Sequence, residues 1–228
     1  MKTPRFRASA TGKLMTKGRK KDELLGETAK TMIEELFLRN EFGYDEIIQT
    51  KEMKKGHLCE AESRDLVQKV LGGSYRKRNT TNFHNEYFTG TPDIILEGDQ
   101  VIEDIKNSWS LKTFFKADGS NKDYYWQGQT YMELTGAKVF RLIYTLNPIP
   151  EDLMIDEERK LYYQFGQDEL NDDYQRAVTQ LYHNNDLING LKPEQRVKVF
   201  TFERDDEAIK LMYDQAKAGI EYYNTLEL

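Results

Sequence analysis

Residues 91–107, TPDIILEGDQVIEDIKN, contain two short apolar runs separated by a turn signal. The runs cover residues 93–97 and 100–106, and both are rich in isoleucine, leucine and valine, which favour strands. Between them lies Gly98-Asp99, a dipeptide that is typical of hairpin turns. The stretch therefore predicts an antiparallel hairpin.

Charged side chains occupy defined positions on this hairpin. Residues two apart in a strand point to the same face, so Asp104 and Lys106 share one face and Glu103 and Ile105 take the other. The turn folds the first strand back, which brings Asp93 toward Asp104. Two close carboxylates need a compensating cation, and oxygen ligands suit Mg²⁺ or Mn²⁺. The alternative is a salt-bridged strand pair on a solvated face.

The flanking sequence predicts further helices and strands. We expect helices at residues 27–40, 56–71, 122–135 and 205–226, and helical stretches at 161–165 and 173–183. We expect further strands at residues 85–89, 138–146 and 196–202. This order predicts an α/β fold with a mixed central β-sheet that is flanked by helices on both faces.

Length and composition favour one domain. The chain has 228 residues, of which 38% are hydrophobic and 32% are charged, as in ordinary globular proteins. Within this domain we expect a basic N-terminal helical arm (1–50), a catalytic core (51–146) and an acidic helical C-terminal part with one further strand (147–228). No apolar run approaches the about 20 residues of a membrane span, and the N-terminus has no secretory signal. We therefore expect a cytoplasmic protein that does not contact membranes.

Cysteine and histidine are too sparse for a soft metal site. The one cysteine, Cys59, excludes a disulfide within the chain and a cysteine-ligated zinc or iron–sulfur cluster. The three histidines, His57, His84 and His183, do not cluster by spacing. Any metal is therefore expected to be held by oxygen atoms.

Charge is distributed unevenly along the chain, whose net charge is −6. Residues 150–228 hold 18 acidic and 9 basic residues, a net charge of −9, so residues 1–149 carry a net charge of +3. The half that contains the hairpin is therefore the half that is suited to face a polyanion.

Two further segments supply candidate site residues. Glu60, in the run GHLCE, falls in the first turn of a predicted helix, from which its carboxylate can point toward a metal. Gln127 and Tyr131 are four residues apart and share one helix face, where an amide and a phenol can contact a phosphate backbone. The alternatives are a carboxylate that favours a helix N-terminus and an aromatic core helix.

The order of these motifs, G-x-x-x-E, P-D, D-x-K and Q-x-x-x-Y across residues 51–146, resembles the PD-(D/E)XK nucleases. It is most similar to the RecB-family and phage lambda exonuclease branch, which includes the YqaJ-like viral recombination nucleases. The resemblance implies a restriction-endonuclease-like core and a Mg²⁺-dependent DNA nuclease, with Mn²⁺ able to substitute. It favours an exonuclease of phage recombination or replication, in the host cytoplasm, over a structure-selective endonuclease.

The resemblance also assigns roles to residues. It implies metal binding by three carboxylates and one carbonyl, those of Glu60, Asp93, Asp104 and Ile105. It makes Lys106 the catalytic lysine, with Gln127 and Tyr131 as accessory catalytic residues. It places DNA contacts at Arg7, Ser9, Arg64 and Thr91. The third acid is Asp104 where the lambda enzyme has glutamate, and a shifted strand register would exchange its role with that of Glu103.

Two other functions remain open from the sequence. The first is a nucleic-acid-binding module that has the fold without catalysis. The second, compatible with a nuclease, is a docking role for the acidic residues 150–228, with a single-strand annealing protein as candidate partner. An oligomer is also compatible with the sequence.

Overall fold

A four-stranded mixed sheet lies at the centre of the structure, a computed structural model in which residues 4–19, 23–96, 98 and 100–228 are described. In spatial order its strands are Ile94–Leu96 (β4), Val101–Asn107 (β5), Val139–Thr145 (β6) and Val197–Glu203 (β7). β5 and β6 run parallel, whereas each pairs with its outer neighbour in antiparallel fashion. The predicted mixed central sheet is confirmed.

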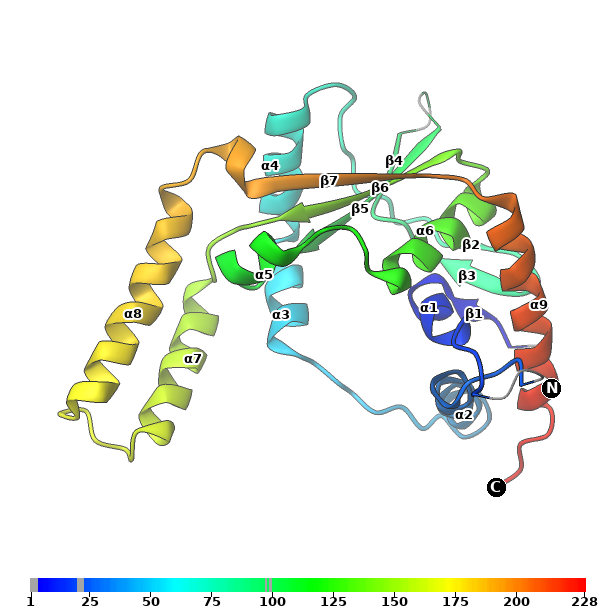
Figure 1. The fold of residues 1–228 in the computed structure, drawn as a ribbon, viewed down its shortest axis with the longest axis horizontal. Helices are drawn as coiled ribbons and strands as arrows, with labels where there is room; N and C mark the ends of the chain where they lie inside the picture. Colours follow the sequence, from blue (N-terminus) through cyan, green and yellow to red (C-terminus); the bar gives the residue numbers. More distant parts are fainter. Residues whose placement is uncertain (1–3, 20–22, 97, 99) are drawn as a thin grey trace.

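Helices cover both faces of this sheet (Figure 1). Helix α4 (Glu60–Leu71) packs on one face, where it contacts β5, β6 and β7. Helix α6 (Lys122–Thr135) packs on the other, where its Met132 contacts Phe140 of β6. The predicted α/β architecture is therefore correct.

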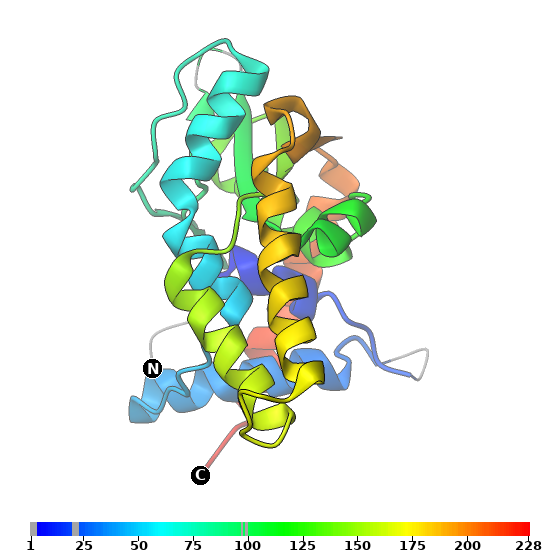
Figure 2. The same cartoon turned by 90° about the vertical axis from the view of Figure 1, so that its left-hand side faces the viewer.

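The other helices lie around this core. They are α1 (Thr11–Leu14), α2 (Glu27–Phe42), α3 (Lys51–Leu58), α5 (Leu111–Lys116), α7 (Glu151–Gln164), α8 (Asp172–Asn189), α9 (Asp206–Tyr223) and the 3-10 helices η1 (Ala8–Ala10) and η3 (Pro193–Arg196). Helices α7 and α8, which cover the helical stretches expected after residue 150 except for Phe165, pack side by side and project from the sheet (Figures 1 and 2). Among the described residues, no helix is long and apolar enough to cross a membrane.

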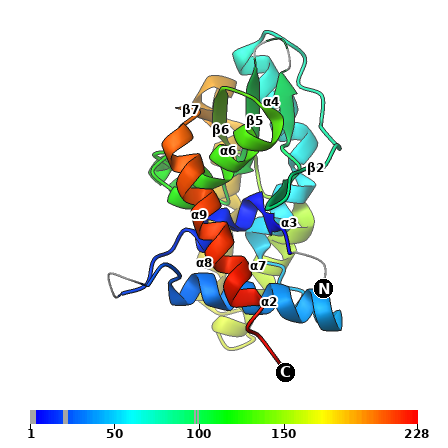
Figure 3. The same ribbon diagram turned by 90° about the vertical axis from the view of Figure 1, so that its right-hand side faces the viewer.

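A second, three-stranded sheet joins the N-terminus to the core. Its strands, in the order β1-β3-β2, are Phe6–Arg7 (β1), Phe88–Gly90 (β3) and Phe83–His84 (β2). Phe6 is buried in an apolar cluster with Leu14 of α1, and α2 and α9 contribute to the same cluster (Figure 3). Of the segment expected to be a basic arm, Lys2, Lys20 and Lys21 lie outside the described residues. Strand β1 was not predicted, because two residues are too few for alternation to be visible.

The predicted hairpin is formed by β4 and β5. The two strands pair antiparallel, with Ile94 opposite Glu103 and Leu96 opposite Val101. Asp99 of the predicted turn and Glu97, at the end of the predicted first strand, lie outside the described residues. The first four residues of β5 are buried, because the strand lies between β4 and β6 and has helices on both sides.

The helix that was predicted at residues 56–71 is two helices, α3 and α4, with a break at Cys59. The ammonium group of Lys55 in α3 is fully buried and donates to three backbone carbonyls just beyond the ends of β5 and β6. The acceptors, at 2.7, 3.0 and 2.6 Å, are the carbonyl oxygens of Ser108, Trp109 and Asn147. These bonds hold α3 at the strand ends while α4 follows the sheet face, so the helix prediction was wrong about continuity.

The strand that was predicted at residues 85–89 is also interrupted. The side-chain oxygen of Asn85 accepts hydrogen bonds from the backbone N–H groups of Tyr87, at 2.9 Å, and Phe88, at 2.8 Å. Asparagine side chains stabilise turns in this way. The segment therefore forms two short strands, β2 and β3, separated by a turn at Asn85.

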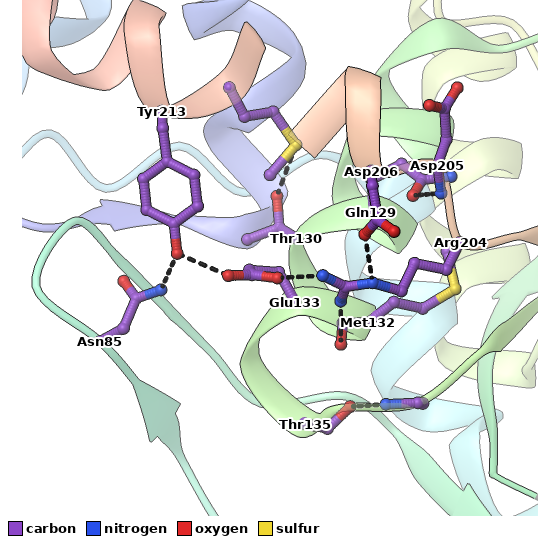
Figure 4. Close-up of polar contacts among 12 residues, drawn as sticks. Asn85, Gln129, Thr130, Met132, Glu133, Thr135, Arg204, Asp205, Asp206 and Tyr213 are labelled. Carbon is purple, nitrogen blue, oxygen red and sulfur yellow. Dashed lines mark hydrogen bonds and ion pairs between the residues drawn. The ribbon is translucent and has the colours of Figure 1, made fainter. Parts of the chain in front are cut away.

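A polar network fixes α6 against the C-terminal helix (Figure 4). Glu133 of α6 accepts from Arg204 at 2.6 Å and from the hydroxyl of Tyr213 in α9 at 2.6 Å. Asn85 donates to the same hydroxyl at 2.9 Å. Because α6 also carries Gln127 and Tyr131, this network holds those two side chains in place over the sheet.

Candidate active site

Asp93 precedes β4 and turns its carboxylate toward β5. Its Oδ2 accepts a hydrogen bond from the backbone N–H of Ile105 at 2.9 Å. The ladder between β4 and β5 ends where Ile94 pairs with Glu103, so the side chain of Asp93 takes the next free N–H of β5. The hairpin thus places Asp93 beside Asp104, as the sequence predicted.

Asp104 and Lys106 form a close ion pair on the α6 face of β5. Asp104 Oδ2 lies 2.6 Å from Lys106 Nζ, and the side chains are 2% and 28% exposed respectively. Burial opposes the charge on Lys106, but the carboxylates of Asp104 and Asp93 outweigh it and raise the pKa of the lysine. Despite this ion pair, Asp104 Oδ2 is buried and accepts no hydrogen bond of normal geometry within the described part of the chain. This oxygen therefore contacts a cation without a hydrogen bond of normal geometry.

Asp93 carries an unfavourable charge. Burial, followed by the nearby carboxylate of Asp104, raises the pKa of Asp93 to about 7, although Lys106 and the N–H of Ile105 act in the opposite direction. Glu60 makes a smaller contribution that also raises the pKa of Asp93. The carboxylates therefore lie close enough together to repel one another, and one lysine does not compensate them fully.

Glu103 faces the opposite side of β5. It is fully buried and accepts two hydrogen bonds from Arg76, at 2.7 and 3.1 Å, and one from Arg141 at 3.3 Å. Its charge is compensated and both of its oxygens are occupied. A shifted register that would exchange Glu103 with Asp104 is therefore excluded.

Gln127 and Tyr131 lie against the same site. Gln127 Nε2 donates to the Tyr131 hydroxyl at 2.9 Å, and that hydroxyl donates to the carbonyl oxygen of Thr91 at 3.3 Å. Burial, with a further contribution from Asp104, raises the pKa of Tyr131. Sequence reasoning missed Tyr124, which lies one turn before Gln127 on α6 and whose ring lies 5.1 Å from the ammonium of Lys106.

Glu60 lies in the first turn of a helix, as predicted, although that helix, α4, begins at Glu60 and not at residue 56, and its carboxylate is held by arginines. Its Oε1 lies 2.8 Å from Arg78 Nε and 3.6 Å from Arg64 Nη1. Glu60, Arg64, Asp93 and Ile105 line a pocket of about 30 Å³, which has room for a cation or a few water molecules. Sequence reasoning missed Arg78, although it stands in the basic and aromatic run SYRKR.

The fit to a divalent cation is partial in this arrangement. Among the described residues, no three His, Cys, Asp or Glu side chains stand close enough together to hold a metal ion. The unsatisfied oxygen of Asp104 and the raised pKa of Asp93 nevertheless suit a cation, and the candidate donors are all hard oxygens. The donor set is chemically suited to Mg²⁺, and in this structure Lys106 and Arg78 pair with the carboxylates of Asp104 and Glu60.

The remaining residues that the resemblance associated with DNA lie in the second sheet or next to its strands. Arg7 ends β1 opposite Thr89, and Ser9 lies in η1; both are exposed. Thr91 follows β3, and its hydroxyl accepts from Asn82 at 3.0 Å. Thr91 reaches the site through its carbonyl contact with Tyr131, and DNA contacts at these residues stay predictions.

Comparison with solved structures identifies the fold. A crystal structure of a phage-related exonuclease from Haemophilus somnus 129PT matches with a TM-score of 0.78 at 24% identity, covering 97% of this chain and 94% of that one. An alkaline exonuclease from Laribacter hongkongensis matches with a TM-score of 0.63, and its complex with dAMP with 0.61, each at 17% identity over 98% of this chain and 89% of that one. No protein-family model and no curated protein matches the sequence. The chain therefore has the fold of these exonucleases.

Proposed function

We propose that this protein is a Mg²⁺-dependent DNA nuclease that hydrolyses phosphodiester bonds, and that it acts as an exonuclease of phage-type recombination or replication. The observation that carries the proposal is the pair of carboxylates of Asp93, which is partly buried, and Asp104, which is buried, with the Lys106 ammonium 2.6 Å from Asp104 Oδ2. Two exonucleases that share the fold, one of which has been crystallised with dAMP, support the choice of substrate.

The side chains of this site have separate tasks in such a reaction. Asp93 and Asp104, with the carbonyl of Ile105 and the carboxylate of Glu60, would hold Mg²⁺, which lowers the pKa of bound water and neutralises charge on the phosphate. The pKa of Lys106 is raised, so it stays protonated and can stabilise negative charge that develops on the phosphate. Gln127 and Tyr131 orient each other and close the α6 side of the site.

A cleavage assay tests the proposal directly. Purified protein is incubated with end-labelled linear duplex DNA and with closed circular DNA, in Mg²⁺ or in EDTA. We expect mononucleotide release from linear DNA in Mg²⁺ and none in EDTA. Lys106→Ala should fold normally and lose cleavage, because the ammonium beside Asp104 is removed.

The same assay separates the alternatives. Circles that are cut as fast as ends are digested would indicate an endonuclease. A protein that binds DNA but releases no product with Mg²⁺ or Mn²⁺ would be a binding module, and its Asp104→Ala variant should bind DNA equally well or more tightly because repulsion of the phosphates falls.

A further inference from the structure

Arg78 forms an ion pair with Glu60, although most of the arginine side chain is exposed to solvent. The guanidinium Nε lies 2.8 Å from Glu60 Oε1, and 62% of the arginine side chain is exposed. Arg64, on the helix that begins with Glu60, approaches the same oxygen at 3.6 Å. Two arginines therefore converge on a carboxylate that lines the pocket shared with Asp93.

The backbone around Arg78 is fixed to the active site. Arg78 forms a β-bridge with Ile94, and the N–H of Asn79 donates to the carbonyl oxygen of Asp93 at 2.8 Å. Two residues earlier, Arg76 makes its buried ion pair with Glu103 of β5. The segment is thus attached to both strands of the hairpin, while most of the side chain of Arg78 is exposed to solvent.

The contact between Arg78 and Glu60 can be exchanged easily. Exposed ion pairs contribute little to stability, because water and salt screen them. A guanidinium binds the oxygens of a phosphate in the same forked geometry as those of a carboxylate. If Glu60 turns to another cation, Arg78 keeps its position beside Asp93 and can take a phosphate.

The charges of the site favour this exchange. Three carboxylates, those of Glu60, Asp93 and Asp104, face three basic side chains, those of Arg64, Arg78 and Lys106. A divalent ion added to this balanced set leaves an excess of positive charge, which an anion would neutralise. A phosphodiester group is the anion that the proposed substrate supplies.

We propose that Arg78 couples metal binding to DNA binding: it holds Glu60 when the metal is absent, and it moves to a DNA phosphate when the metal takes Glu60. This inference rests on the proposed nuclease function. Two consequences follow. The metal and DNA strengthen each other's binding, and removal of Arg78 makes the metal bind more tightly when DNA is absent, since a competing cation is gone.

The test compares Arg78→Gln with Arg159→Gln. Arg159 is a matched control, because it lies on α7, is also 62% exposed and pairs with Asp156 at 3.3 Å. Mn²⁺ affinity is measured by calorimetry without DNA. Affinity for a short duplex is measured by fluorescence anisotropy in EDTA and in Ca²⁺, with intactness of the DNA checked on a gel.

For wild type and Arg159→Gln we expect Ca²⁺ to strengthen DNA binding by about 10-fold or more, a usual size for coupled sites. In Arg78→Gln, Ca²⁺ should strengthen DNA binding much less, and Mn²⁺ should bind more tightly than in wild type. The slope of log DNA affinity against log salt concentration should fall in magnitude by about 1. If Arg78 had only a structural role, its replacement would not raise the affinity for Mn²⁺.

Two results would overturn the inference. If wild type cleaves DNA and Ca²⁺ strengthens DNA binding by Arg78→Gln as much as by wild type, Arg78 does not have this role. The proposed nuclease function would still stand. No binding of Mn²⁺ and no cleavage by wild type would overturn both the inference and the proposed function.

Discussion

The two faces of strand β5 carry adjacent buried carboxylates in opposite surroundings. On the α4 face, Glu103 receives three hydrogen bonds from Arg76 and Arg141. On the α6 face, Asp104 contacts one lysine, and within the described part of the chain its Oδ2 accepts no hydrogen bond of normal geometry. Both residues are buried, so burial alone does not distinguish them.

The difference lies in how completely each charge is compensated. A buried ion pair that is fully hydrogen-bonded costs much stability when one partner is lost, because the other charge is left buried. An incompletely satisfied carboxylate costs stability in the resting protein but retains capacity to bind a ligand. We therefore infer that Glu103 supports the fold and that Asp104 serves the chemistry.

The largest expected effect concerns stability. Glu103→Ala leaves the guanidinium of Arg76 buried without its carboxylate, so we expect the free energy of unfolding to fall by about 3–5 kcal/mol. Urea denaturation followed by circular dichroism measures this change. A loss below about 1 kcal/mol, as found for exposed ion pairs, would contradict the structural role of Glu103.

The reverse pattern is expected on the other face. Asp104→Asn keeps the shape of the side chain but removes its charge, so we expect DNA cleavage in Mg²⁺ to fall by about 10³-fold. The free energy of unfolding should stay within about 1 kcal/mol of wild type, because Lys106 can extend into solvent. If this variant keeps its activity and unfolds easily, the two faces have been assigned the wrong way round.

A smaller effect is expected at the edge of the site. Tyr131→Phe removes the hydroxyl that links Gln127 to Thr91, so cleavage should slow by about 10-fold, as for other residues that orient a site. Tyr125→Phe is the control, because it lies on the same helix but donates to Asp205 at the surface. Equal rates for the two variants would exclude Tyr131 from the site.

Another effect concerns a third environment, that of Lys55, which is fully buried and donates to three backbone carbonyls. Burial lowers its pKa to about 8, and the reference value is 10.5. Between these two values the unfolded chain binds more protons, so this group increases stability as pH rises, by at most about 1.4 kcal/mol per pH unit.

Lys55→Met should lack this pH dependence. The check is the difference in free energy of unfolding between wild type and Lys55→Met, measured by urea denaturation from pH 7 to 10. Above about pH 8, the free energy of unfolding of the wild type should increase relative to that of the variant. A constant difference across this range would show that Lys55 stays charged in the folded protein.

Much of the site follows from local sequence rules. The two-residue repeat of a strand puts Asp104 and Lys106 on one face and Glu103 on the other, and the hairpin turns Asp93 toward them. The spacing of Gln127 and Tyr131 similarly places both on one face of α6. These patterns depend on neighbouring residues, so they can be recognised in the sequence.

Other features depend on residues that are far apart in the chain. The predicted helix breaks at Cys59, and Lys55 of the preceding helix α3 binds the carbonyl oxygens of residues 108 and 147. Strand β1 pairs with β3, which lies far from it in the sequence. The pairing of Arg78 with Glu60 depends on the bridge to β4. The sequence alone determined which side chains share a face of a strand or helix. Only the tertiary structure decided which charges are compensated, because compensation depends on distances between separate elements.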